Sequence, residues 1–350
     1  MKYFVLLWVL CAVACKKSST EVNQDPPELE IKGTDLSFLP LVRQSGITLY
    51  NSYNQAEDML TTLKNAGVNT IRLRLWKNPT DPVSSFASVK NIAQECHSIG
   101  MKVLLSVHYS DTWADPGNQT KPAQWQSSTL NQLKDSIRVY TQLVVDEIQP
   151  EYIQIGNEIN NGILWPDGSY NNFANFKSLL QAAIAGARNA VPETKIILHY
   201  AGFTDASAFF SSFTDLDYDI IGLSYYPIWH GKDLNALASA LESLNSTYNR
   251  KIFIAETAYP FTLGFNDYTN NIIGLQSQLL PAYAPTPDGQ KQFLLKLKDI
   301  CTNASGCLGF CYWGTEWVSF AGSTSTNGSP WENQAFWDFS NKTLPVLDVY

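Results

Sequence analysis

The segment GMKVLLSVHY at residues 100–109 carries the pattern that decides the fold. In it, a short β-branched and apolar run directly follows a helical stretch and ends in polar and aromatic side chains. The segments GVNTIRLRLW at 67–76 and ETKIILHY at 193–200 repeat this arrangement. Strands that each follow a helix, repeated along one chain, are typical of βα units with a parallel sheet.

Amphipathic helices are predicted between the strands, most clearly at 129–148 and 233–248, where apolar residues recur at helical spacing. Eight βα units between residues 31 and 350 match a (β/α)8 barrel, whose usual size is ~250 residues plus insertions. We therefore predict an α/β fold, a single-domain TIM barrel at 31–350. Such barrels carry their active sites at the strand ends. The predicted ends are Asp35, Trp76, His108, Glu158, Tyr200, Tyr226, Glu256 and Trp313.

Composition excludes some classes of partner and favours others. The net charge is −8 with a pI near 5.0, which argues against nucleic acid. Aromatic residues make up 13% of the chain and include ten tryptophans. That content is typical of proteins with sugar-stacking grooves, although core packing is the alternative interpretation of any single tryptophan.

The N-terminus has the pattern of an export signal. An apolar run from Tyr3 to Val13, too short to span a bilayer, follows Lys2 and leads to Ala14 and Cys15. Small residues before a cysteine resemble a bacterial lipoprotein cleavage box, which predicts a signal peptide at residues 1–14 and lipid attachment at Cys15. The alternative is an ordinary secretory signal.

The polar, proline-containing residues 15–30 are predicted to be a flexible tether between membrane and barrel. We expect an exported protein anchored by lipid to a bacterial membrane, at the outer membrane or cell surface. The tether sequence does not discriminate between the inner and outer membrane.

Four cysteines remain after the signal: Cys96, Cys301, Cys307 and Cys311. Their spacing does not match a zinc site, so no metal ligand is predicted among them. Export permits disulfides. Cys307 and Cys311 lie four residues apart in a predicted strand and cannot readily bridge each other, whereas a bridge from Cys301 to a neighbour stays open.

Two carboxylates end the fourth and seventh predicted strands. Glu158 follows YIQIGN at 152–157, and Glu256 lies in KIFIAETAYP at 251–260. The two are expected to face each other across the barrel mouth. Two facing carboxylates are the catalytic groups of glycoside hydrolysis, and their separation decides whether one acts as a nucleophile or activates a water. A lone glutamate at a strand end is more often a surface charge, so the prediction rests on the pair.

Neighbouring residues are predicted to support Glu256. Arg72 would keep it ionised by charge pairing and hold its pKa low, and Tyr226 would donate a hydrogen bond to it. Asn157 is placed to hydrogen-bond the sugar 2-hydroxyl, a contact that strengthens in the transition state. Arg74 points to the same face as Arg72 by strand alternation, and is either a second site residue or a structural ion-pair partner.

Glu158, by contrast, must be protonated in the resting enzyme. A negative Glu256 and apolar neighbours such as Ile155 and Trp165 would raise the pKa of Glu158. His108 and His199 are expected to donate hydrogen bonds to sugar hydroxyls or to the catalytic pair. The alternative is a core histidine with satisfied hydrogen bonds, and zinc would need a third ligand.

Six segments together resemble glycoside hydrolase family 53, the endo-β-1,4-galactanases. They occur in the family's order and are GVNTIRLRLWKNP, VHYSDTWADPGNQTKPAQW, IQIGNEINNGILWP, IIGLSYYPIW, IAETAYP and FCYWGTEWVS. The resemblance implies a (β/α)8 fold in a clan of retaining glycosidases, with Glu158 as acid/base and Glu256 as nucleophile. It implies cleavage of internal β-1,4-galactosyl bonds in pectic galactan and type I arabinogalactan, without a required cofactor.

The resemblance also implies further substrate contacts. Asp111, Trp113, Asn160 and Trp165 would line the groove. Trp313 and Trp317 would stack on sugars at the minus subsites. They join the strand-end residues expected to bind substrate, which are Asp35, Arg72, His108, Asn157, His199 and Tyr226.

Bacterial relatives in this family can bind structural calcium in the loop after the nucleophile. Here that loop reads PFTLGFNDYTNN, with Asp267 as its only acid. Calcium normally takes more than one carboxylate, so a calcium ion is not favoured.

Two other functions stay open at the level of sequence. A mannanase or cellulase of the same clan would use the same two glutamates. A surface lipoprotein that binds glycan on an inactive hydrolase scaffold is the alternative from another class, although both glutamates are present.

We expect the protein to be a monomer.

Overall fold

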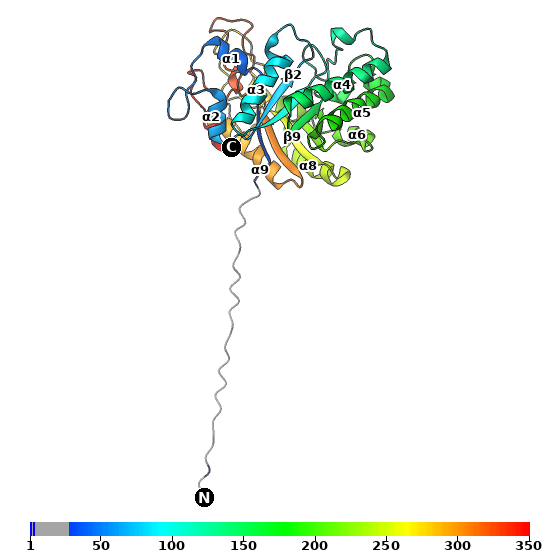
Figure 1. Ribbon diagram of the computed structural model, residues 1–350. Coiled ribbons are helices and arrows are strands. Elements are labelled where there is room, and N and C mark those ends of the chain that lie inside the picture. The colour runs from blue at the N-terminus through cyan, green and yellow to red at the C-terminus, as the bar shows by residue number, and fades with distance from the viewer. Residues whose placement is uncertain (2, 4–27) are drawn as a thin grey trace.

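The computed structural model describes residue 1, residue 3 and residues 28–350 (Figure 1). The predicted signal peptide, Cys15 and most of the predicted tether therefore lie outside the described residues. Within the part that is described, no helix is long and apolar enough to cross a membrane.

Eight parallel strands form a closed barrel, in the order β1-β10-β9-β8-β7-β4-β3-β2. Each strand pairs with the next barrel strand along the chain, and β1 pairs with β10 to close the cylinder. The predicted TIM barrel is confirmed. The strands are β1 (Ile31–Asp35), β2 (Thr70–Leu75), β3 (Lys102–Val107), β4 (Tyr152–Ile155), β7 (Lys195–Ala201), β8 (Ile220–Ser224), β9 (Lys251–Thr257) and β10 (Cys307–Tyr312).

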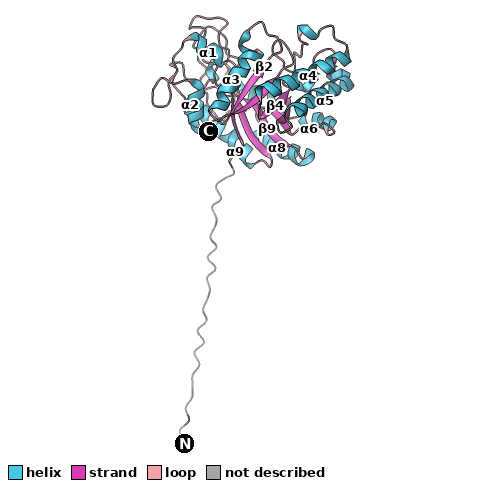
Figure 2. Ribbon diagram, viewed as in Figure 1, coloured by secondary structure: helices cyan, strands magenta, loops and turns pink. Residues whose placement is uncertain are grey.

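Helices surround the strands, as Figure 2 shows. The predicted helix at 129–148 is α4, which begins after a capping box formed by Thr129 and Gln132. The predicted helix at 233–248 is α8, and the Asp233 side chain caps its first turn. The helices are α1 (Leu39–Ser45), α2 (Met59–Ala66), α3 (Phe86–Ser98), α4 (Leu130–Ile148), α5 (Phe173–Ala190), α6 (Ala206–Phe210), α7 (Pro227–His230), α8 (Leu234–Tyr248) and α9 (Pro287–Asn303). A small hairpin of β5 (Gly162–Ile163) and β6 (Gly168–Ser169) lies in the loop after β4.

Strand alternation separates the apolar core from the site. In β2, Ile71 and Leu73 belong to the large apolar cluster between strands and helices. Arg72 and Arg74 alternate with them and point to the barrel interior, where Arg72 donates to Gln154 Oε1 and Ser106 Oγ. The sequence RLRL thus places two arginines inside the barrel near its C-terminal end.

The four cysteines beyond the signal region are free thiols. Cys96 lies in α3, and Cys311 faces the barrel interior from β10. The thiols of Cys301 and Cys307 lie 3.7 and 3.8 Å from the same carbonyl oxygen, that of Gly309. The structure therefore contains none of the bridges that the sequence left open.

Candidate active site

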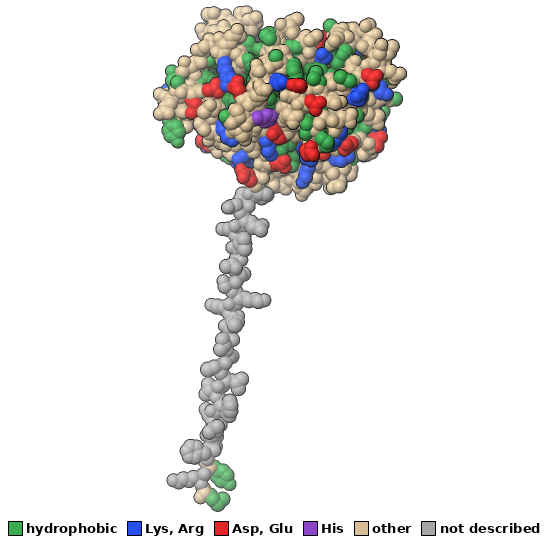
Figure 3. All heavy atoms as spheres, in the orientation of Figure 1, with side chains coloured by type: hydrophobic (Ala, Val, Ile, Leu, Met, Phe, Trp, Pro, Cys, Tyr) green, Lys and Arg blue, Asp and Glu red, His purple; other side chains and the backbone are tan. Residues whose placement is uncertain are grey.

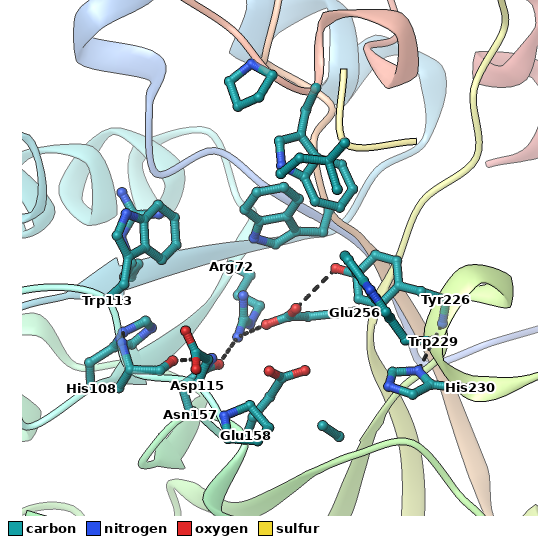
Figure 4. Close-up of a pocket in the computed structure, with 18 of the residues that line it drawn as sticks. Arg72, His108, Trp113, Asp115, Asn157, Glu158, Tyr226, Trp229, His230 and Glu256 are labelled. Carbon is teal, nitrogen blue, oxygen red and sulfur yellow. Dashed lines mark hydrogen bonds and ion pairs between the residues drawn. The ribbon is translucent and has the colours of Figure 1, made fainter. Parts of the chain in front are cut away.

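A cleft of about 560 Å³ lies at the C-terminal ends of the barrel strands. Glu158 and Glu256 both line it, as predicted, and Figure 4 shows their carboxylates pointing into the same space. Five tryptophans form much of the remaining wall: Trp113, Trp229, Trp313, Trp317 and Trp331. The cleft thus joins two acids with the flat apolar surfaces that sugar rings stack on.

Glu256 near the end of β9 is fixed by a hydrogen bond on each oxygen. Arg72 donates to Oε1 over 2.8 Å, and the Tyr226 hydroxyl donates to Oε2 over 3.0 Å. Both predicted partners are therefore in place. Burial raises the pKa of Glu256, while Arg72 and Tyr226 oppose the shift. The expectation of a low pKa was wrong, because the loss of hydration in this buried position outweighs the charge of Arg72.

Arg72 connects the acid to the strands around it. Its Nη1 donates to Asp35 Oδ2 over 2.9 Å, and its Nη2 also donates to Asn157 Oδ1 over 2.8 Å. Arg72 and Asp35 are almost fully buried. Asp35, which was predicted to contact substrate, is instead placed behind the cleft as an ion-pair partner of Arg72, and it is not a cleft-lining residue.

Glu158 turns into the cleft directly after β4. Its backbone φ of 46° is left-handed, a conformation that residues other than glycine rarely adopt. The Ser224 hydroxyl at the end of β8 donates to Glu158 Oε1 over 2.6 Å. Burial and the charge of Glu256 raise the pKa of Glu158 to about 8, and Ser224 opposes them. A protonated acid at neutral pH was predicted, and this raised pKa agrees with it.

The two predicted histidines occupy different positions. His108 lines the cleft, and its Nδ1 accepts from the Ala114 backbone N–H over 3.0 Å. His199 is fully buried and contacts Ser224 Oγ through Nε2 over 2.9 Å. Burial lowers the pKa of both histidines well below the ordinary value, so both are neutral. His199 Nδ1 accepts from the Glu158 backbone N–H over 3.3 Å, and its Nε2 reaches the Glu158 carboxylate through Ser224, which sequence reasoning missed.

Asn157 lines the cleft, but its amide already has partners. Its Nδ2 donates to the Ala114 carbonyl over 2.9 Å, and its Oδ1 also accepts from Gln154 over 3.0 Å. The buried Gln154 was not predicted either, although its place one residue before the end of β4 points its side chain into the barrel interior, where it accepts from Arg72.

Three residues predicted to line the groove instead fix the loops. Asn160 bonds both the N–H and the carbonyl of Ala201, at 2.8 and 2.9 Å. Trp165 donates to the Asn161 carbonyl over 2.9 Å, and Asp111 accepts from the Ala123 N–H over 2.8 Å. None of the three belongs to the cleft lining, so Trp165 is not among the apolar walls of the site around Glu158.

The aromatic wall extends beyond the predicted Trp113, Trp313 and Trp317. Trp331 packs edge-on against Trp313, with ring centroids 4.5 Å apart. Trp229, in the short helix α7, packs on the Tyr226 ring at 5.2 Å and is 53% exposed. The sequence signal for Trp229 was its place three residues beyond Tyr226, the predicted end of that strand.

A second buried carboxylate, which sequence reasoning missed, packs against the loop after β9. Glu332, from the segment after β10, accepts through Oε1 from the backbone N–H groups of Asn266 and Asp267. Asp267 itself accepts from the Thr269 N–H over 2.6 Å and the Ser329 N–H over 3.3 Å. Among the described residues, no group of three or more acidic, histidine or cysteine side chains could hold a metal. Two carboxylates already bonded to backbone donors are a poor fit for a calcium ion.

Comparison with known proteins places this architecture in one family. Residues 31–350 match Glycosyl hydrolase family 53. The chain is 33% identical over 336 residues to an arabinogalactan endo-β-1,4-galactanase of Cellvibrio japonicus, covering 90% of this chain and 89% of that protein. It is 30% identical over 374 residues to an endo-β-1,4-galactanase of Bacillus subtilis, covering 91% and 85%.

Solved structures agree. The GH53 catalytic domain of Ignisphaera aggregans superposes with a TM-score of 0.85 at 35% identity, covering 91% of this chain and 94% of that one. A structure from a study of two fungal β-1,4-galactanases gives a TM-score of 0.80 at 29% identity, covering 92% and 99%. The chain is therefore a glycoside hydrolase that belongs to family 53.

Proposed function

We propose that this protein is a retaining endo-β-1,4-galactanase that cleaves internal bonds of pectic galactan and type I arabinogalactan. The observation that carries the proposal is the different setting of the two cleft carboxylates. Burial raises the pKa of both carboxyl groups, but Arg72 and Tyr226 donate to Glu256 and favour its ionised form, whereas the charge of Glu256 raises the pKa of Glu158 further, to about 8, and favours its protonated form. A nucleophile and an acid need this division of roles.

In the first step, a Glu256 oxygen forms a bond to the anomeric carbon of the galactosyl ring at the cleavage site. The glycosidic C–O bond breaks, and the leaving oxygen takes the proton of Glu158. The products are a galactosyl ester on Glu256 and a shortened chain with a free hydroxyl. In the second step, the Glu158 carboxylate accepts a proton from water, whose oxygen attacks the anomeric carbon and releases Glu256.

The reaction itself changes the pKa of Glu158, which acts first as an acid and then as a base. The negative charge of Glu256 helps to raise the pKa of Glu158 in the resting enzyme. Esterification removes that charge, so the pKa of Glu158 falls when it must act as a base. The Ser224 hydrogen bond favours the carboxylate form throughout and assists the second step.

The galactan specificity is supported by the relatives named endo-β-1,4-galactanases and by the aromatic cleft. A mannanase of the same fold is the main alternative. Solved GH113 β-mannanases superpose with TM-scores of 0.51 and 0.52 at 14% and 16% identity, which is a likeness of fold alone.

The test is to incubate purified residues 16–350 with linear β-1,4-galactan, β-mannan and β-glucan and to resolve the products over time. An early spread of galactan oligosaccharides that shortens later supports the endo-galactanase. Cleavage of mannan or glucan instead would overturn the specificity. Binding of galactan without any cleavage would favour the non-catalytic glycan-binding protein.

The retaining mechanism has its own test. Proton NMR of the earliest products should show the β anomer at the new reducing end. The Glu158→Ala variant, given azide, should form a β-galactosyl azide, since a small anion needs no base. An early α anomer would contradict a covalent intermediate on Glu256.

We also propose that the protein is exported and anchored by lipid on Cys15 at the outer membrane or cell surface, as a monomer. The support is the small-residue box before Cys15 and the polar residues that separate it from β1. The wild type should partition into detergent from membranes, and Cys15→Ser should not. Release of the wild type into the medium would favour an ordinary secretory signal.

A further inference from the structure

Arg74 is a buried cation with no counter-ion in contact. It is 2% exposed, and among residues 28–350 no carboxylate oxygen lies within ion-pair distance of its guanidinium. Its Nε donates to Ser84 Oγ over 3.0 Å, and its buried Nη2 has no hydrogen-bond partner. The ion-pair role considered from the sequence is therefore absent. An unpaired buried charge is costly, so another interaction must offset it.

Three aromatic rings surround the Arg74 guanidinium. Its central carbon lies 4.5 Å from the ring centroid of Phe38, 4.7 Å from that of Trp76 and 3.9 Å from that of Trp113. The rings come from three separate segments, which follow β1, β2 and β3. A guanidinium is planar and weakly hydrated, so it can contact ring faces where an ammonium would stay hydrated.

The rings around Arg74 continue into the substrate cleft. Trp113 lines the cleft and lies 6.2 Å from Trp313 between ring centroids. Phe38 packs edge-on against Trp317 at 4.1 Å. Arg74 therefore lies in the lining of the cleft, almost fully buried against an aromatic wall whose rings face the substrate. Figure 4 shows Trp113 on the opposite side of the cleft from Tyr226 and Trp229.

We propose that Arg74 is a positioning residue that holds the Trp113 ring in the orientation that stacks on a galactosyl unit. This inference rests on the proposed galactan specificity. Arg74 lies beside Arg72 in the strand but acts on binding of the sugar chain, whereas Arg72 acts on the nucleophile. An apolar side chain of similar length would fill the space, but it would not attract three ring faces.

The test compares Arg74→Met, Arg74→Lys, Trp113→Ala and the double variant Arg74→Met/Trp113→Ala on linear β-1,4-galactan. Arg74→Met should raise KM by roughly tenfold while kcat falls less than about threefold, the pattern of lost binding rather than lost chemistry. Arg74→Lys should recover part of the KM, since it restores the charge but not the planar contact. The double variant should have the KM of Trp113→Ala alone, because Arg74 acts through that ring.

Arg188→Met is the matched control. Arg188 is a partly buried arginine at the end of α5 that pairs with Asp217 and Asp219, away from the cleft. The Arg188→Met substitution should lower Tm and leave KM unchanged. Near-ultraviolet circular dichroism should change in Arg74→Met and not in Arg188→Met, because only Arg74 contacts tryptophan rings.

Three results would overturn the inference. They are an Arg74→Met variant with lower Tm but wild-type KM, a KM effect that adds fully to that of Trp113→Ala, and a loss confined to kcat. A wild type that cuts no galactan would instead overturn the proposed function. In that case the near-ultraviolet spectra still test whether Arg74 fixes Trp113.

Discussion

Arg72 donates to Glu256 Oε1 over 2.8 Å while its other terminal nitrogen donates to Asp35 over 2.9 Å, and all three groups are buried. One cation thus balances two carboxylates. We expect Arg72→Met to leave both acids without a counter-ion, which costs about 3–5 kcal/mol for a broken buried pair. Activity should fall by at least ~100-fold, because a group fixed against the reacting carboxylate is lost.

The measurements for Arg72→Met are initial rates on galactan and thermal unfolding. Arg72→Lys is the control, since it keeps a charge but cannot bond Asp35, Asn157 and Glu256 together. It should unfold at a temperature between those of the wild type and Arg72→Met. Wild-type stability in Arg72→Met would show that the network does not hold the site.

The pH profile should report Glu158. Its pKa is raised to about 8, and the first step requires its protonated form, so kcat/KM should fall as pH rises through about 8. The Ser224 hydrogen bond lowers this pKa. Ser224→Ala should therefore move the alkaline limb to higher pH, and an unmoved limb would mean that another group sets it.

Stability should depend on the same proton. In the folded protein the pKa of Glu158 is raised to about 8, so the carboxyl keeps its proton up to that pH. In the unfolded chain the proton is released near the ordinary pKa of 4.5. Folding therefore binds a proton between these values, and the free energy of unfolding falls as pH rises across them. Glu158→Gln stays neutral, so its Tm should drop less than that of the wild type between about pH 5 and pH 8. Equal drops would place the titrating group elsewhere.

Trp229 should contribute to the binding of long galactan chains. It lines the cleft, is 53% exposed and packs on Tyr226, so its free face is available to a sugar ring. Trp229→Ala should raise KM for galactan roughly two- to tenfold, the size of one aromatic contact. Tyr53→Ala is the control, because Tyr53 is 82% exposed but lies outside the cleft. Equal KM values for the two variants would exclude Trp229 from binding.

Metal removal should have no effect. The two carboxylates near the loop after β9, Asp267 and Glu332, already accept from backbone N–H groups. We therefore expect the same Tm in excess EDTA and in added calcium. A Tm that rises with calcium concentration would show a bound ion and contradict this prediction.

Local sequence patterns were enough to predict most of the residues around the catalytic pair. The alternation in RLRLW predicted that Arg72 and Arg74 share a face, and the strand ends predicted that Glu158, Glu256 and Tyr226 meet at the barrel mouth. These inferences succeed because the side-chain period of a strand is fixed by its backbone. The loop residues Asp111, Asn160 and Trp165 were predicted less well, because a loop side chain can turn to the cleft or bond its own loop.

By itself, the sequence determined the barrel, its strand ends and the pair of acids, since repeated βα patterns and strand alternation are local properties of the chain. Only the tertiary structure decided that Ser224 bonds Glu158, that Glu332 lies beside Asp267, and that three rings rather than a carboxylate surround Arg74. Apart from the contact of Arg74 with Trp76, which lies two residues further along, each contact joins segments far apart in the chain. Their partners depend on strand register and on how the loops pack, and burial then decides the pKa of the groups they enclose.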